Sequence, residues 1–249
     1  MKYKLGEKHK NFNLYRVAYL RDIPRHGVKK GDIGGWIEHE GNLSQKGDCV
    51  VLDEAWVSGN AEVFGEAQIS GNAQVFDNAQ VFGDAQVFAN ASVSGNAQVY
   101  GNAVVSGNAR VFDNAQVSGN ARVSDNAAVS DNARVFGNAR VSDNAAVFGN
   151  AAVFGDAQVY GNSLVVVGEL AANSRIANSS DIGFFKSRYS ITVTPQNITI
   201  GCTTKSLYGK DTWHKVTRKS DIAEGLSNAE FTAIKKAVTL LEKLIPKRR

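Results

Sequence analysis

The side chains of this chain best suited to catalysis or metal binding are four histidines and two cysteines. They are His9, His26, His39, His214, Cys49 and Cys202. Histidine is the usual general base near neutral pH, and several histidines together can hold zinc. Here these residues are scattered, without metal-ligand spacing, a nucleophile motif or a phosphate-binding glycine loop. We therefore interpret His39 and His214 as structural and Cys49 as a small core residue, and we expect no cofactor and no metal.

A six-residue repeat fills the middle of the chain and contains none of the histidines. Eighteen units follow one another, from the unit that starts at Val57 to the unit that starts at Val159. Position one is aliphatic, position two is Ser, Phe or Tyr, position three is mostly Gly or Asp, position four is mostly Asn, and position five is almost always Ala. The departures at positions one, four and five are Ile69, Glu66, Asp84, Asp156 and Ser163. Because an internal repeat dictates the fold, the architecture of this region follows from the pattern of its units.

Each repeat predicts a short strand followed by a corner. Side chains of a strand alternate between two faces, so the Ala and Val that lie two positions apart share one side. That side is always small or β-branched, and it must be the interior. The Gly-Asn and Asp-Asn pairs tolerate positive φ and suit turns. Stacked units of this kind form a parallel β-solenoid, and the small interior residues favour a slim triangular section with three repeats in each coil.

The aliphatic residue every six positions, with a small residue two positions before it, resembles the hexapeptide-repeat family of left-handed parallel β-helices. The resemblance covers residues 33–182, and it alone implies the left hand. More narrowly, "GDIGGWIEHEGNLSQKGDCVV" followed by such repeats resembles phage- and prophage-encoded proteins of unknown function, often labelled putative transferases. The family is best known for acyltransferases with a histidine base, and it includes zinc carbonic anhydrases with three histidines. The repeat units here have no histidine and no long corner insertion.

We predict a mainly β protein with three regions. Residues 1–32 form a small β cap, residues 33–182 form the β-helix with regular coils over 51–164, and residues 183–249 form a β-hairpin and an amphipathic α-helix. The repeat frame is expected to extend backwards through Ile33 and His39, with Trp36 folded over the first coil. It loses one position of phase after Val165. The hairpin surrounds residues 195–197, and the helix opens at a capping box that starts at Ser227.

Charge is distributed unevenly along the chain. Residues 51–164 carry 11 acidic and 4 basic side chains and no lysine, whereas both flanking regions are basic and the whole chain has a formal charge of +4. Such asymmetry can mark a partner surface or can simply keep the molecule in solution. No apolar run approaches the length of a membrane span, and the N-terminus does not resemble a signal peptide. We expect a cytoplasmic protein, in the host cytosol if it is phage-encoded, with no membrane contact.

One of the three predicted outward columns is far more aromatic than the others. Equivalent positions of successive coils stack, and this column contains Phe64, Phe82, Tyr100, Phe136 and Phe154, interrupted by Ser118, with Gln80 and Gln98 beside it. Its neighbouring corner has only glycine at position three. Stacked aromatics can stabilise a sheet from within, but an exposed apolar patch also marks a binding surface. We favour a partner-binding face made of these five aromatic residues and two glutamines. Glu66 and Asp84 also share its corner, and their two carboxylates raise the hypothesis of a weak cation site.

These observations lead to one functional hypothesis and one alternative. We expect a non-enzymatic β-solenoid scaffold, phage- or prophage-encoded, that binds a second copy of itself, a host protein or both, for example as a counter-defence factor. Nucleic acid is a less favoured partner, and a DNA-mimicking role is weakened by a charge of only about one per coil against the much denser charge of DNA. The alternative is an acyltransferase-like enzyme of the hexapeptide-repeat kind with a site that its residues do not reveal.

Overall fold

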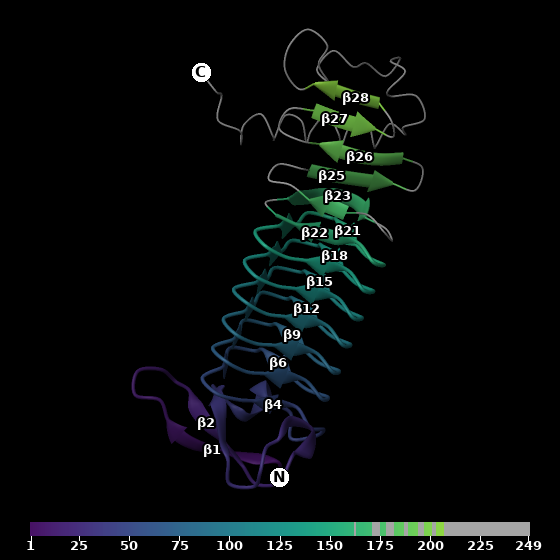
Figure 1. The fold of residues 1–249 in the computed structure, drawn as a ribbon. Helices are drawn as coiled ribbons and strands as arrows, with labels where there is room; N and C mark the ends of the chain where they lie inside the picture. The colour runs from purple at the N-terminus through teal and green to yellow at the C-terminus, as the bar shows by residue number, and fades with distance from the viewer. Residues whose placement is uncertain are drawn as a thin grey trace.

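The protein is described here from a computed structural model that covers residues 1–161, 163–170, 175–177, 182–186, 189–193, 197–200 and 203–206. Side chains are described through residue 161 and at residues 163 and 165. The molecule is a parallel β-solenoid with strands β1 and β2 at its N-terminal end (Figure 1). This confirms the predicted fold class. Each repeat forms one short strand and one corner, so the strands β5 to β22 correspond to the repeat units one by one.

Three stacks of parallel strands form the three faces of the body. The Trp face contains β3 (Ile33–Ile37), β5 (Trp56–Val57), β8 (Gln74–Val75), β11 (Ser92–Val93), β14 (Arg110–Val111), β17 (Ala128–Val129), β20 (Ala146–Val147) and β23 (Leu164–Leu170). The ladder face contains β6 (Glu62–Val63), β9 (Gln80–Val81), β12 (Gln98–Val99), β15 (Gln116–Val117), β18 (Arg134–Val135) and β21 (Ala152–Val153). The third face contains β4 (Val50–Val51), β7 (Gln68–Ile69), β10 (Gln86–Val87), β13 (Val104–Val105), β16 (Arg122–Val123), β19 (Arg140–Val141), β22 (Gln158–Tyr160) and β24 (Arg175–Ala177).

The interior consists of the repeated Ala and Val side chains. Val81 and Val99 pair in register between neighbouring coils, and both are fully buried, as is Ala97. Between coils, the backbone N–H of Gln80 donates to the carbonyl of Ala97 at 2.9 Å, and the same bond recurs along the body. The small interior side chains therefore allow the three sheets to lie close together, which agrees with the slim section predicted from the sequence.

The corners depend on one residue with left-handed backbone. Position three has positive φ in every described unit, and where it is Asp the carboxylate accepts the backbone N–H of the equivalent residue in the next coil. Asp77 accepts from Gly95 at 3.0 Å in this way. Ala89 has φ of 61° but offers neither the freedom of glycine nor an acceptor. At position four many of the Asn side chains form series of amide hydrogen bonds, such as that from Asn108 Nδ2 to Asn126 Oδ1 at 3.0 Å.

An antiparallel hairpin closes the N-terminal end of the solenoid. β1 (Tyr3–Lys8) pairs with β2 (Tyr15–Tyr19), and β2 pairs with β3. Tyr3 and Tyr19 are buried against the first coil, where the Tyr19 hydroxyl donates to the carbonyl of Val51 at 3.0 Å. Two short 3-10 helices, η1 (Pro24–His26) and η2 (Glu40–Asn42), complete this end. The prediction that Trp36 folds over the first coil is wrong, because Trp36 pairs with Trp56 on the Trp face and the two tyrosines cover the end.

The backward extension of the repeat frame is also wrong at its first two positions. Ile37, and not His39, is aligned with Val57, Ile33 pairs with Ala18 of the N-terminal hairpin, and Leu43 bridges to Val63, so the first coil is two positions longer than a regular one. Ile33 is 62% exposed. The physical reason is η2, where the Asn42 amide donates to the carbonyls of Gly59 and Ala61 and takes the place of a regular corner.

The C-terminal end departs from the repeat as predicted. Val153 pairs with Leu170, whereas a regular coil would bring it to the following position, so the coil after Val165 is one position short. β25 (Ile182–Lys186) continues the Trp face in parallel, and β26 (Tyr189–Val193), β27 (Asn197–Ile200) and β28 (Thr203–Ser206) follow as an antiparallel series. The predicted hairpin is the β26–β27 pair. The predicted helix from Ser227 lies outside the described residues, and no helix within them could cross a membrane.

Candidate functional site

The predicted partner-binding residues lie together on the ladder face. Each aromatic residue follows a strand of this face directly, and its side chain points away from the buried Val and Ala. The five rings are half-buried, as are Gln80 and Gln98, and Gln98 Nε2 donates to Gln80 Oε1 at 3.2 Å. The outward direction predicted from strand alternation is therefore confirmed, and the role of this face in binding a partner stays a prediction.

The rings stack on one another along the axis of the solenoid. Phe64 and Phe82 have centroids 4.7 Å apart and planes 3° apart, and Phe82 and Tyr100 are 5.0 Å and 2° apart. Phe136 and Phe154 form a second stack at 5.0 Å and 8°. These spacings are close to the distance between neighbouring strands, so the strand register sets them. Each ring thus covers part of its neighbour's face. Stacking within the chain therefore explains part of the burial of these rings.

The corner beside this column has glycine at every coil. Its six glycines are Gly65, Gly83, Gly101, Gly119, Gly137 and Gly155, all with positive φ. A Cβ on Gly101 would approach the backbone nitrogen of Gly119 to 3.1 Å. Other corners accept Asp or Ala in the same conformation, so the turn itself does not require glycine throughout. The consequence is that position three of this corner places no side chain at the edge of the ladder face.

The two acidic side chains at the start of this corner already have a cation. Arg25, in η1, contacts Asp84 through Nη2 and lies 3.9 Å from Glu66 through Nη1. The hypothesis of a weak cation site between Glu66 and Asp84 is therefore replaced by an ion-pair cluster within the chain. At the other end of the corner, Asp156 accepts the last amide of its column, from Asn138 at 3.0 Å.

The histidines of the described residues are used to build the N-terminal end. His39 Nε2 donates to the carbonyl of Gly59 at 2.9 Å, while its Nδ1 accepts from the N–H of Gly41 at 3.1 Å, so both ring nitrogens hold η2 in place. His9 Nδ1 accepts from two backbone N–H groups in the loop after β1. His26 Nε2 is buried and has no hydrogen-bond partner in the described part of the chain. His214 lies outside the described residues.

Cys49 is a core residue, as predicted, and it has a buried lysine beside it. Lys2 Nζ donates to the Cys49 carbonyl at 2.7 Å and lies 2.9 Å from Cys49 Sγ, and both side chains are almost fully buried. Burial lowers the pKa of Lys2 and raises the pKa of the Cys49 thiol. A thiol with a raised pKa is a poor nucleophile, so we assign no chemistry to Cys49. The contacts of Lys2 with Cys49 instead hold the start of β1 against the solenoid. Within residues 1–161 and the shorter described segments, no group of three His, Cys, Asp or Glu could hold a metal ion.

An aromatic cluster on the Trp face was not foreseen from the sequence. The Trp36 and Trp56 side chains lie on adjacent strands, and the loop between β1 and β2 lies against them, with the Phe12 ring edge-on to Trp56 at 5.5 Å and His9 edge-on to Trp36 at 4.8 Å. The Arg16 guanidinium lies over the Trp36 ring at 4.0 Å and forms an ion pair with Glu54 at 2.5 Å. A signal was present, because Trp56 occupies the position before Val57 where later repeats carry Gln, Arg, Ala, Ser, Glu, Val or Leu.

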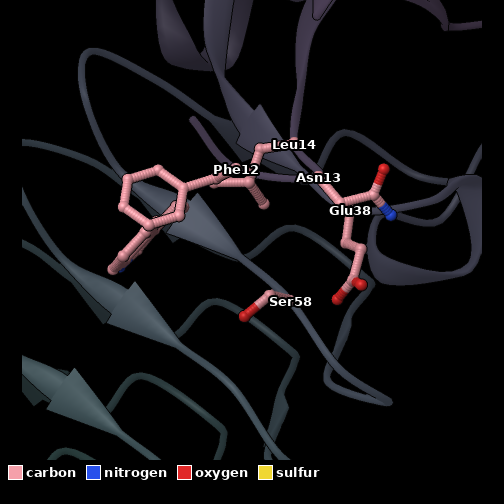
Figure 2. A pocket seen from close by; sticks show the side chains of 6 residues that line it. Phe12, Asn13, Leu14, Glu38 and Ser58 are labelled. Carbon is pink, nitrogen blue, oxygen red and sulfur yellow. The ribbon is translucent and has the colours of Figure 1, made fainter. Parts of the chain in front are cut away.

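Two small hollows flank Phe12 in this cluster. One has a volume of about 160 Å³ and is lined by Phe12, Asn13, Leu14, Glu38, Trp56 and Ser58. Figure 2 shows the Glu38 side chain and the Ser58 hydroxyl below the Phe12–Leu14 segment. The other has a volume of about 240 Å³ and is lined by His9, Phe12, Leu14, Trp36, Glu54, Trp56, Asn72 and Gln74. Phe12 and Trp56 border both, so one aromatic pair separates two partly polar recesses.

One comparison with known proteins agrees with the repeat. A family model described as "YdcK Beta solenoid repeat" matches residues 67–81, 97–113, 115–131 and 127–143, which are less than half of the chain. The chain is thus similar to that repeat over part of its body. No curated protein matches it. A hexapeptide transferase family protein from Anaplasma phagocytophilum aligns over 84% of this chain and 90% of that chain at 14% identity, with a TM-score of 0.23, too low to support an argument.

Proposed function

We propose that this protein is a non-catalytic scaffold that binds a protein through its ladder face. The observation that carries the proposal is the aromatic column on that face, with five aromatic residues in six coils beside Gln80 and Gln98. The equivalent column of the Trp face alternates Ser and Phe, and that of the third face has only Phe88 and Tyr160 as aromatic residues. An apolar stripe at the surface, interrupted here by Ser118 alone, is typical of an interaction surface.

The construction of the body suits a binding surface. Its interior is fully buried and its strands are held in register on both sides, so the rings are presented at fixed spacing before any partner arrives. A surface that is ordered in advance loses little conformational entropy on binding. The glycine corner beside the ladder face allows a partner's backbone to approach closely.

The hydrogen bonds of His39 and His9 weigh against the acyltransferase-like alternative. His39 uses both ring nitrogens in structural hydrogen bonds, and His9 accepts two backbone N–H groups with its Nδ1. A general base needs a ring nitrogen that faces a substrate. The prophage setting of the proteins that the sequence resembles extends the proposal to a partner in the host cytosol, for example a defence protein that this chain counteracts. A second copy of the chain is the other candidate partner.

The test replaces Phe82 and Tyr100 together by serine, which is the residue that Ser118 already provides in the same column. Truncated aromatic anchors at an interface typically weaken binding by about 2 kcal/mol or more each. We expect the double variant to lose self-association in sedimentation analysis, or capture of its protein partner, while its β-sheet circular dichroism is unchanged.

A matched control comes from the Trp face. Phe76 and Phe112 have serine at the equivalent positions of the coils on both sides, so replacing both by serine removes two aromatic rings without touching the ladder face. This control should keep the assembly state and the captured partner. If the two double variants behave alike, the aromatic column only stabilises the solenoid and the proposal fails.

A further inference from the structure

We propose that the hollow between Phe12, Trp56 and Glu38 is a binding site for an organic ammonium cation, such as a choline head group or a methylated lysine side chain. This site lies on the Trp face and is independent of the ladder face. The proposal rests on an exposed aromatic ring, a carboxylate that forms no ion pair in the described part of the chain, and the arrangement of the neighbouring tryptophan.

The neighbouring tryptophan already has a cation of its own. Over Trp36 lies the Arg16 guanidinium, 4.0 Å from the ring centre, and the Glu54 carboxylate holds both Arg16 and the Trp36 indole N–H. An aromatic face with a carboxylate beside it attracts cations by its quadrupole and by charge. The Trp36 half of the cluster is therefore a completed cation site with the cation supplied by the chain.

The Trp56 half has the same components without the cation. Trp56 and Glu38 line one hollow, and within the described part of the chain no lysine or arginine lies over the Trp56 ring. Glu38 accepts the backbone N–H of Gly59 at 2.7 Å, and in the same part of the chain it forms no ion pair. The carboxylate therefore has no cationic partner among the described residues and lines the hollow beside an aromatic wall.

Phe12 supplies the second wall of the hollow, and its apolar ring is exposed to water when no ligand covers it. Phe12 is 53% exposed, although it belongs to the loop that packs against Trp36 through His9 and against Trp56 through Phe12 itself. Figure 2 shows the Phe12 ring at one side of the hollow and Glu38 at the other. The volume of about 160 Å³ is below the range of roughly 300–1,000 Å³ that holds drug-sized ligands, so a single head group or side chain is the occupant that fits.

The experiment measures binding of choline and of its neutral isostere, 3,3-dimethyl-1-butanol, by NMR of the tryptophan indole N–H signals. We expect choline to shift the Trp56 signal and to bind at least fivefold more tightly than the isostere, because only the cation gains from Glu38 and the ring faces. Trimethyl-lysine, titrated in parallel, identifies whether a free head group or a protein side chain is the better ligand. No shift at Trp56, or equal affinity for choline and the isostere, would overturn the proposal.

Three variants make the assignment specific. Glu38→Gln keeps an oxygen that can accept the Gly59 N–H, and it should weaken choline binding about fivefold while leaving the isostere unaffected. Phe12→Ala removes an exposed wall and should weaken binding at least as much without lowering the melting temperature. Glu62→Gln removes an exposed acid from the ladder face and should change nothing. If Glu38→Gln and Glu62→Gln bind choline equally well, the site is not the one proposed.

Discussion

In the repeat body the same contacts recur from coil to coil, whereas in the N-terminal segment, residues 1–49, hardly any contact occurs twice. The body relies on backbone hydrogen bonds between coils, Asn-to-Asn amide bonds and small buried side chains. In the N-terminal segment a buried lysine, two buried tyrosines and three arginines make individual contacts, and every ion pair in the described residues involves one of those arginines.

This difference indicates how well each region tolerates amino-acid substitutions. A repeated contact is one of many, so its loss is local, and in repeat proteins stability is close to a sum over neighbouring units. A contact that occurs once has no substitute. The N-terminal segment also covers an open sheet end, which would otherwise offer unpaired strand edges to other chains. Substitutions in this segment should therefore have larger effects than matched substitutions in the body.

The largest effect is expected for Gly35→Ala. A Cβ at this position would lie 2.4 Å from the carbonyl oxygen of Ala55 and 2.8 Å from Val51 Cγ1, and a backbone oxygen cannot move aside as a flexible side chain can. We expect a loss of about 3 kcal/mol or more in the free energy of unfolding, measured by denaturant titration. The matched body variant is Gly101→Ala, which faces a left-handed φ and should lose only about 1–2 kcal/mol. Equal losses for both variants would contradict the comparison.

The second effect is loss of stability at alkaline pH, from the two buried tyrosines. Burial is the main cause that raises the pKa of Tyr3 and Tyr19 above their ordinary value of 10. Between the unfolded and folded pKa values the unfolded chain has lost protons that the folded chain keeps, so stability falls as pH rises. Each tyrosine should contribute a slope of up to about 1.4 kcal/mol per pH unit above about pH 10.

The measurement is the free energy of unfolding between about pH 10.5 and 12, in the wild type and in Tyr3→Phe. Lys2 has the opposite sign, because burial lowers its pKa, and its contribution to the slope fades above the ordinary value of 10.5 as the unfolded lysine also loses its proton. Tyr3→Phe also loses hydrogen bonds to the carbonyls of Glu40 and Leu43, which lowers stability at every pH. The slope is therefore the readout, and it should be shallower in the variant. An unchanged slope would show that Tyr3 does not control the alkaline transition.

The body could be predicted from the sequence because its pattern is periodic. Strand alternation decided which side of each unit is buried, and the outward direction of Phe82 and Tyr100 followed from it. The shortened coil after Val165 was visible as a change of phase by one position. The N-terminal segment could not be predicted in the same way, because no period relates Asn42, Lys2 or Tyr19 to the groups that they contact. The Phe12 hollow depends on a loop folding back onto strands that come much later in the chain, which no local pattern records.

A smaller effect, of the opposite sign, is expected for Ala89→Gly. Ala89 is the one alanine among the described residues with a left-handed backbone, at φ of 61°, and this conformation typically costs about 1–2 kcal/mol for a residue with a Cβ. Glycine should raise the free energy of unfolding by about 1 kcal/mol, detectable as a higher melting temperature. Ala128→Gly, on an outward strand position, is the control and should lower stability slightly. If Ala89→Gly also lowers stability, the left-handed backbone of Ala89 does not limit the stability of the body.

The smallest effect is expected where the two regions meet, at Arg25. Its side chain is 51% exposed, and the acids that it contacts, Glu66 and Asp84, are 35% and 43% exposed. Exposed ion pairs typically contribute less than about 1 kcal/mol and are screened by salt. Arg25→Ala should therefore lower stability by under about 1 kcal/mol in low salt and by less in high salt, as measured by denaturant titration.

The compensating variant at this junction is Asp84→Asn. In other coils of the same corner an Asn donates to the equivalent side chain of the next coil, as Asn102 does to Asn120 at 3.3 Å, and Asp84 has no amide to donate to Asn102. Asparagine at position 84 would lose the contact with Arg25 but extend the amide series by one coil. In the Arg25→Ala background it should therefore restore part of the lost stability, whereas in the wild type the gain and the loss should nearly cancel. If Asp84→Asn is equally harmful in both backgrounds, the acid at this corner serves something other than Arg25, and the boundary between repeated and unique contacts must be drawn elsewhere.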